Sequence, residues 1–115
     1  MEHTTDTNLN FLVPESNYEA MITKILKKEI KPSVVIYEWH FEALVDEKQF
    51  NFKIGMFSSQ MADLLHVLGA EEVSNGKFKW NDDEQLGKNL SFNVVHFPDK
   101  NGKLRATLTD IKLLS

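Results

Sequence analysis

Three side chains with chemical potential stand at alternate positions of one apolar segment. Glu38, His40 and Glu42 lie within Val34–Val45, and alternation along an extended chain would place all three on one face. An imidazole between two carboxylates has the parts for a metal site or for acid–base catalysis. Exposed charges on a half-solvated strand show the same pattern and are more common. The sequence therefore leaves a small enzyme or an inhibitor open as a minor alternative.

Other signatures of catalysis are missing from the sequence. The four histidines, at positions 3, 40, 66 and 96, show none of the HxH, HxxxH or HExxH spacings of metal sites, and the chain has no cysteine. It also has no glycine-rich phosphate loop and no nucleophile elbow. We therefore predict that the chain is not an enzyme and that it binds no metal and no cofactor.

Lysines dominate the basic side chains. Of the 13 basic residues only Arg105 is an arginine, and the formal net charge is −4. A lysine contacts a phosphate as a point charge, whereas base reading favours the bidentate guanidinium of arginine. A nucleic acid would therefore be held by its backbone rather than by its bases. The candidate contacts fall at the end of one expected strand, on another strand and at the final turn: Lys24, Lys27, Lys28 and Lys31; Lys53; and Lys100, Lys103 and Arg105.

Aromatic residues would have to supply the stacking platforms for unpaired bases. The candidates are Tyr37, Trp39, Phe52, Trp80 and Phe97. Tyr37 and Trp39 alternate with polar residues on a face that a sheet also needs for its core, so packing competes with ligand contact there. Trp80 and Phe97 lie near expected loops and are the better candidates.

The first half of the chain predicts a meander of three strands. Val34–Val45 and Gln49–Met56 alternate between apolar and polar residues, and Asp46-Glu47-Lys48 between them is typical of a turn. The preceding segment, Tyr18–Ile30, is ambiguous because part of it favours a helix locally. We expect a strand there, since the next two segments need a partner.

Strict alternation along Tyr18–Ile30 assigns its side chains to two faces. Ile22 and Leu26 would share one face with Tyr18 and Ala20, and the opposite face would carry the following residues: Met21, Thr23, Ile25 and Lys27. Leu26 is therefore expected to point the same way as Ile22.

The spacing then changes to that of a helix. Ser58–Gly69 places apolar residues three and four positions apart, with Ser58 as a candidate N-cap and Gly69 as a candidate C′ residue. This pattern predicts a helix of about three turns. Ala70–Glu84 is typical of an acidic linker, in which Phe78 and Trp80 would form a short strand or a lid.

The final segment, Leu86–Leu114, predicts a β-hairpin. Pro98–Gly102 has turn chemistry, because proline presets φ and the Asn-Gly pair tolerates positive φ. One face of each arm is apolar and would join the core: Leu90, Phe92 and Val94 in the first arm, and Leu104, Ala106 and Leu108 in the second.

Three strands, a helix and two further strands are the connectivity of the OB-fold, a five-stranded Greek-key β-barrel with a helix between strands three and four. We therefore expect a mostly β protein in which residues 18–115 form one OB-like domain. Residues 1–17 would form a loose N-terminal arm whose Phe11-Leu12-Val13 segment packs on the barrel. Ligands of this fold usually lie across strands two and three. The two lysine-rich loops would flank that groove.

A resemblance to a known family rests on several short segments. They are Tyr18–Ile22, Trp39–Leu44, Leu64–Ala70 and, most strongly, Leu86–Leu90 followed by the turn Asn101-Gly102-Lys103. They resemble small phage and mobile-element proteins, often catalogued as a domain of unknown function, that are thought to bind single-stranded DNA through an OB-fold. The resemblance implies non-sequence-specific binding of single-stranded DNA in replication or recombination of such an element, with replication or recombination proteins as further partners.

The remaining expectations concern location and partners. The polar start and the lack of an apolar run of about 20 residues predict no signal peptide and no membrane contact, and hence a cytoplasmic protein, in the host cell if phage-encoded. A homodimer could form through an exposed edge strand or through the Phe11-Leu12-Val13 segment. The main alternative is an OB-like protein-interaction module that binds a protein partner and no nucleic acid, which the acidic charge and the scarcity of arginine favour.

Overall fold

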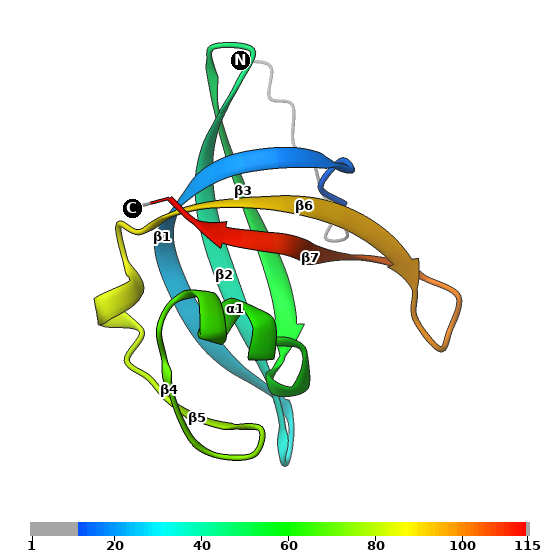
Figure 1. Ribbon diagram of the computed structural model, residues 1–115. Coiled ribbons are helices and arrows are strands. Elements are labelled where there is room, and N and C mark those ends of the chain that lie inside the picture. Colours follow the sequence, from blue (N-terminus) through cyan, green and yellow to red (C-terminus); the bar gives the residue numbers. More distant parts are fainter. Residues whose placement is uncertain (1–11, 115) are drawn as a thin grey trace, which may run out of the picture.

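The computed structural model describes residues 12–114, which form mostly β structure with one short α-helix (Figure 1). Five of the strands in these residues make one antiparallel sheet in the order β3-β2-β1-β6-β7. Their bounds are β1 Ser16–Lys31, β2 Val34–Val45, β3 Lys48–Phe57, β6 Asn89–Pro98 and β7 Leu104–Leu113. The predicted mostly β class is confirmed. No pairing joins β3 to β7 within residues 12–114, so the sheet is not closed into a barrel.

The long strand β1 joins the two halves of the sheet. From Ala20 to its end β1 pairs with β2, and from Ser16 to Met21 it pairs with β6 on its other edge. Figure 1 shows how β1 bends as it passes from one neighbour to the other. The meander β1–β2–β3 and the hairpin β6–β7 therefore diverge from β1.

A β-bulge in β1 changes which residues face the core. Ile22 pairs with Phe41 and Lys24 pairs with His40, so Thr23 is an extra residue in the register. Beyond the bulge Ile25 points into the core, whereas Leu26 is only half-buried. The expectation that Leu26 shares the face of Ile22 is therefore wrong, because strict alternation does not pass through a bulge.

The core lies between the bent sheet and the helical segment. Aromatic rings fill its centre, with ring centroids 5.0 Å apart for Phe41 and Phe92 and 5.4 Å apart for Phe41 and Phe52. Val94, on the same arm of the closing hairpin as Phe92, is fully buried as predicted, and Leu108 is also buried, whereas Leu104 near the β6–β7 turn is half exposed.

The predicted three-turn helix is shorter than expected. A 3-10 turn, Ser58–Gln60, precedes α1, Ala62–Val67. Ser58 is not the N-cap of α1; the backbone N–H of Phe57 instead donates to the side-chain oxygen of Gln60 at 2.9 Å. The apolar residues that suggested a longer helix are nonetheless buried: Met61, Leu64, Leu65 and Leu68.

The end of α1 has the predicted geometry. Gly69 has a φ of +82°, and its N–H donates to the carbonyl of His66 at 3.1 Å. The N–H of Ala70 donates to the carbonyl of Leu65 at 3.0 Å. These two bonds form a Schellman motif, in which glycine supplies the left-handed conformation at C′.

The acidic segment after α1 is a structured cover rather than a plain linker. It forms a small hairpin of β4, Glu71–Ser74, and β5, Lys77–Lys79, followed by a 3-10 turn, Asp83–Gln85. Phe78 and Trp80 are half-buried against the core, as expected of a lid. No helix within residues 12–114 has the length and apolarity that crossing a bilayer requires.

The segment before β1 also packs on the sheet. Val13 is buried, and the hydroxyl of Tyr18 donates to the carbonyl of Pro14 at 2.8 Å. A ring nitrogen of His96 lies 2.6 Å from the carbonyl oxygen of Val13. The packed domain thus includes Val13, earlier than the predicted boundary at residue 18. Phe11 lies outside the described residues.

Candidate nucleic-acid interface

The side of the β1–β2–β3 meander that faces away from the core carries the most polar groups. The register of the three strands places Lys24 beside His40, and His40 beside Lys53. We call this surface the outer face, and define it by the side chains of Lys24, Lys28, Ile36, Glu38, His40, Glu42, Asn51, Lys53 and Phe57.

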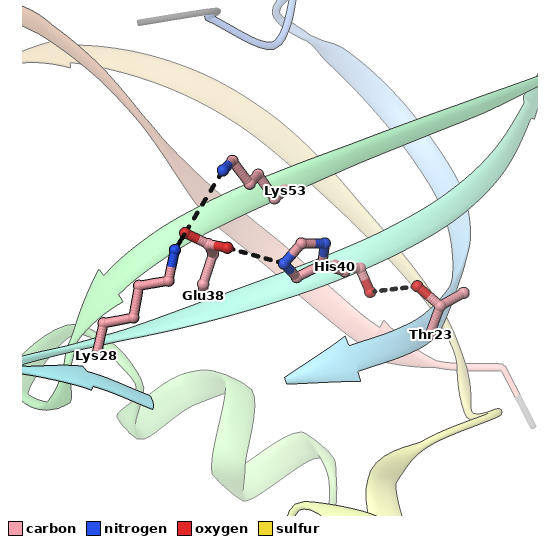
Figure 2. A network of polar contacts seen from close by, with 5 residues as sticks. All are labelled: Thr23, Lys28, Glu38, His40 and Lys53. Carbon is pink, nitrogen blue, oxygen red and sulfur yellow. Dashed lines mark hydrogen bonds and ion pairs between the residues drawn. The ribbon is translucent and has the colours of Figure 1, made fainter. Parts of the chain in front are cut away.

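Glu38 is the centre of a polar network on the outer face (Figure 2). One of its carboxylate oxygens, Oε2, lies 3.1 Å from Nζ of Lys28 and 3.6 Å from Nζ of Lys53. The other, Oε1, lies 2.9 Å from Nε2 of His40. The backbone carbonyl of His40 accepts a hydrogen bond from the hydroxyl of Thr23, the bulge residue, at 3.3 Å. The network therefore connects all three strands of the meander.

The network determines the ionisation of Glu38. Its side chain is only 13% exposed, and this burial alone would raise its pKa. Hydrogen bonds from Lys28 and His40, together with the charges of Lys53 and Lys28, outweigh the burial and lower the pKa of Glu38 below its ordinary value. The carboxylate is therefore ionised at neutral pH and holds the two lysines in place.

A shallow groove adjoins the network. It has a volume of about 500 Å³, and Thr23 marks its β1 side. Its other lining residues come from β2 and β3: His40, Phe41, Glu42, Asn51, Phe52 and Lys53. The groove lies across the second and third strands of the meander, where the sequence predicts the ligand of an OB-like fold.

The first group of predicted lysines divides between two faces. Lys24 and Lys28 lie on the outer face, opposite His40 and Ile36 in the register. Lys27 is opposite Tyr37 and therefore on the inner side of β1. Lys31 pairs with Val34 next to the tight β1–β2 turn. Only part of this group can act together with Lys53.

The second basic group lies at the β6–β7 turn, where Asp99 organises the chain. One carboxylate oxygen of Asp99 accepts the backbone N–H groups of Asn101 and Lys103 at 2.8 and 3.0 Å. The other accepts Nε of Arg105 at 3.1 Å. Slight desolvation would raise the pKa of Asp99, but the bonds from Lys103, Asn101 and Arg105 outweigh it and lower that pKa. Arg105 is therefore engaged within the protein, whereas Lys100 is exposed.

The two basic groups lie on separate projections of the molecule. Figure 1 shows the β1–β2 tip at the bottom and the β6–β7 tip at the lower right, with the two hairpins pointing in different directions. A single strand of nucleic acid that touched both tips would have to cross the molecule between them.

The predicted aromatic platforms are mostly part of the core. Trp39 is fully buried, and its ring lies stacked on Trp80 with centroids 5.5 Å apart and an interplanar angle of 18°. Tyr37 also contacts Trp80, at 5.6 Å, and is half-buried, as are Trp80 and Phe97. The roles of Trp39 and Phe52 as base platforms are therefore corrected: the ring of Trp39 has no exposed surface because Trp80 covers it, and Phe52 is buried in the core.

Sequence reasoning missed Phe57 as a member of the outer face. Phe57 is the last residue of β3, pairs with Ile36, and is 46% exposed. The signal was present in the alternation, because extending the expected strand by one residue past Met56 places Phe57 on the same face as Lys53.

The alternation of Glu38, His40 and Glu42 does not bring the three groups together. His40 bonds to Glu38, and His40 and Glu42 both line the groove, but no hydrogen bond or ion pair joins Glu42 to either of them among the described residues. Among residues 12–114 no three histidine, aspartate or glutamate side chains gather as metal ligands would.

No protein-family model matches the chain, and neither does any curated protein sequence.

Proposed function

We propose that the chain binds single-stranded DNA on the outer face of an OB-like domain, without preference for sequence. The meander β1–β2–β3 followed by the hairpin β6–β7 on the other edge of β1 supports an OB-like topology. Open OB barrels bind oligonucleotides across their second and third strands, which carry the groove here.

The convergence of Lys28 and Lys53 on Glu38 is the observation that carries the proposal. The two lysines come from strands on either side of β2 and are both more than half exposed. An ammonium group has three donors, so a contact with Glu38 leaves others for phosphate oxygens. Glu38 thus gathers two ammonium groups on one face, lowering their net charge without occupying all of their donors.

The side chains of the outer face indicate backbone contact with little base reading. Its basic residues are lysines, and its one exposed aromatic ring is Phe57 at the end of β3. Backbone contacts by lysines with a single stacked base give salt-sensitive, sequence-tolerant binding. In the cell such a protein would cover single strands during replication or recombination of a phage or other mobile element.

Fluorescence anisotropy with a labelled oligothymidine of about 30 nucleotides, several times the footprint of one OB-fold, tests the proposal. We expect salt-sensitive binding that is weaker for the corresponding duplex. The double variant Lys28→Gln/Lys53→Gln should weaken binding and reduce the slope of log K against log salt by about 0.7 for each lost contact. Lys100→Glu/Lys103→Glu reports separately on the β6–β7 tip.

The matched control is Lys77→Gln/Lys112→Gln, which makes the same charge change on exposed residues of β5 and β7. If Lys77→Gln/Lys112→Gln lost as much DNA affinity as Lys28→Gln/Lys53→Gln, the effect of charge would be non-specific and the assignment to the outer face would be overturned. No binding of folded wild-type protein to either DNA would overturn the function itself. The burial of Trp39 and the partial burial of the other platforms would then favour a protein-binding module.

A further inference from the structure

We propose that a second site, a cleft between the start of β1 and the tip of the β2–β3 hairpin, binds an extended peptide of a partner protein that alternates basic and apolar residues. The inference goes beyond DNA binding and does not depend on it. The cleft has a volume of about 630 Å³ and none of its lining residues belongs to the groove beside Glu38.

The divergence of β1 from β2 creates this cleft. The pair Ala20 and Ala43 is the last one between the two strands. Before Ala20, residues Ser16–Glu19 of β1 pair only with β6, and beyond Ala43, β2 continues to Val45 paired only with β3. Figure 1 shows the β2–β3 hairpin projecting past the bent start of β1. The side of β1 between Ser16 and Glu19 that turns away from β6 therefore pairs with no strand among the described residues.

An unpaired strand edge of this length is a site for β-augmentation. Alternate residues of an antiparallel strand turn both backbone groups toward the same neighbour, so part of the Ser16–Glu19 backbone is directed at the cleft. Four residues span about 13 Å, enough to pair with a short extended segment. Main-chain hydrogen bonds would provide affinity and alternate side chains the selectivity.

The side chains around the cleft define the apolar positions of the peptide. Tyr18 of β1 and Phe50 of β3 line the cleft, with ring centroids 6.1 Å apart. Leu44 and Val45 of β2 also line it, and Leu44 is 76% exposed, the most of any large apolar residue described. An apolar side chain in the cleft would cover Leu44 and Val45, which are 76% and 38% exposed, whereas Tyr18 is already buried and Phe50 half-buried in the fold.

The charges around the cleft define the other positions. Glu15 and Glu19 line it, Asp46 and Glu47 form the adjacent hairpin turn, and Lys48 is the one basic lining residue. Glu19 is exposed, and its side chain forms no hydrogen bond or ion pair within the described part of the chain, although its backbone lies in the β1–β6 pairing. If a peptide strand paired with β1, its side chains pointing away from the core would have Asn17 and Glu19 as cross-strand neighbours. Lysine or arginine at those peptide positions would therefore lie next to the Glu19 carboxylate.

Charge complementarity also argues against the chain's own N-terminal segment as the occupant. Residues 1–11 contain Glu2 and Asp6 but no lysine or arginine. A basic segment of another protein matches the cleft better than this acidic one.

Nuclear magnetic resonance of the full-length, 15N-labelled protein tests the site. The probe is a capped hexapeptide of alternating lysine and valine, titrated into the millimolar range. We expect shift changes confined to residues 15–19 and 44–50. The variant Glu19→Lys should weaken binding at least tenfold, whereas Glu71→Lys, the same change on an exposed residue of β4, should leave it unchanged. N-methylation of alternate backbone nitrogens of the peptide should abolish binding.

Each of the following results would overturn the proposal. Shift changes elsewhere, or none, would place no peptide in the cleft, and equal binding of the N-methylated peptide would reduce the interaction to charge alone. Concentration-dependent shifts at residues 15–19 in the free protein, with a dimer in light scattering, would make a second copy the occupant. Contacts from residues 2–10 to the cleft in the free chain would make the chain its own ligand. Loss of DNA binding by Glu19→Lys is not expected, so the two sites can fail independently.

Discussion

The ring of Trp80 lies stacked on the ring of Trp39 at a centroid distance of 5.5 Å, and the covered ring has no exposed surface. Trp39 comes from the middle of β2, whereas Trp80 directly follows the β4–β5 hairpin. The stacking explains why an acidic segment with few apolar residues is held against the sheet. It also means that two residues with the chemistry of base platforms contribute to the fold.

Replacing Trp80 therefore tests structure rather than ligand binding. We expect Trp80→Ala to lower the free energy of unfolding by about 2 kcal/mol, less than for a fully buried tryptophan, because Trp80 is only half-buried. Urea unfolding monitored by circular dichroism would measure the change. Trp80→Phe, which keeps an aromatic ring on Trp39, should recover most of the loss. If Trp80→Ala left stability unchanged but weakened DNA binding, the ring would be a platform after all.

The pH dependence of stability follows from the lowered pKa of Glu38. Because the folded pKa is below the unfolded value of about 4.3, ionised Glu38 stabilises the fold fully above that value, and the contribution disappears as the pH falls through the folded pKa. Glu38→Gln should therefore cost about 1 kcal/mol at pH 7, since its lysine partners are largely exposed. Unfolding free energies of the two proteins should converge once the pH has fallen below the lowered, folded pKa of Glu38. A difference that persisted at low pH would contradict the role of the charge.

The same variant should act in the opposite direction on ligand binding. Glu38→Gln removes a negative charge from the outer face and releases Lys28 and Lys53 from their ion pairs. We expect tighter binding of oligothymidine and a steeper salt dependence, measured by anisotropy at pH 7. Weaker binding by folded Glu38→Gln would mean that the positions of the lysines matter more than the charge of the face.

Regular alternation predicted the strands because each buries one face. The expected bounds of β2 are those observed, and β3 differs by one residue at either end. The bulge at Thr23 could not be predicted, since it depends on how β1 bends between two neighbours and leaves no local pattern. The α-helix was overestimated because Ser58–Gln60 forms a separate 3-10 turn before α1, which the helical spacing of the apolar residues at 61–68 does not reveal.

The candidate site was predictable in its residue types but not in its contacts. Alternation assigned Glu38, His40 and Lys53 to an exposed face, and the structure places them there. Their convergence with Lys28 depends on the register across β1, which the bulge determines. The burial of Trp39 depends on Trp80, a residue 41 positions along the chain in a segment that looked like a linker.

The β6–β7 turn should depend on the acceptor capacity of Asp99. We expect Asp99→Ala to lower the melting temperature and to disorder the turn, because the backbone N–H groups of Asn101 and Lys103 lose their acceptor. Asp99→Asn retains one oxygen for those donors and loses only the charge that pairs with Arg105. Amide hydrogen exchange at the turn should therefore increase strongly in Asp99→Ala and little in Asp99→Asn. Equal effects would assign the order of the turn to the ion pair.

The β2–β3 turn contains removable backbone strain. Asp46 and Glu47 have φ angles of 52° and 66°, and they form a two-residue loop between the paired residues Val45 and Lys48. Positive φ at both positions is the type I′ geometry, which favours glycine at the second. We expect Glu47→Gly to raise the free energy of unfolding by about 1 kcal/mol, because a side chain in the left-handed region crowds the backbone. Urea unfolding at pH 7 would measure it.

A charge effect has to be separated from this conformational one. Glu47 follows Asp46 directly, so removing its carboxylate also relieves repulsion at the tip. Glu47→Ala removes the same charge but keeps a Cβ atom, and therefore should not be more stable than the wild type by more than a few tenths of a kcal/mol. If alanine stabilised the protein as much as glycine, repulsion between the acidic residues, and not backbone strain, would limit the stability of the hairpin.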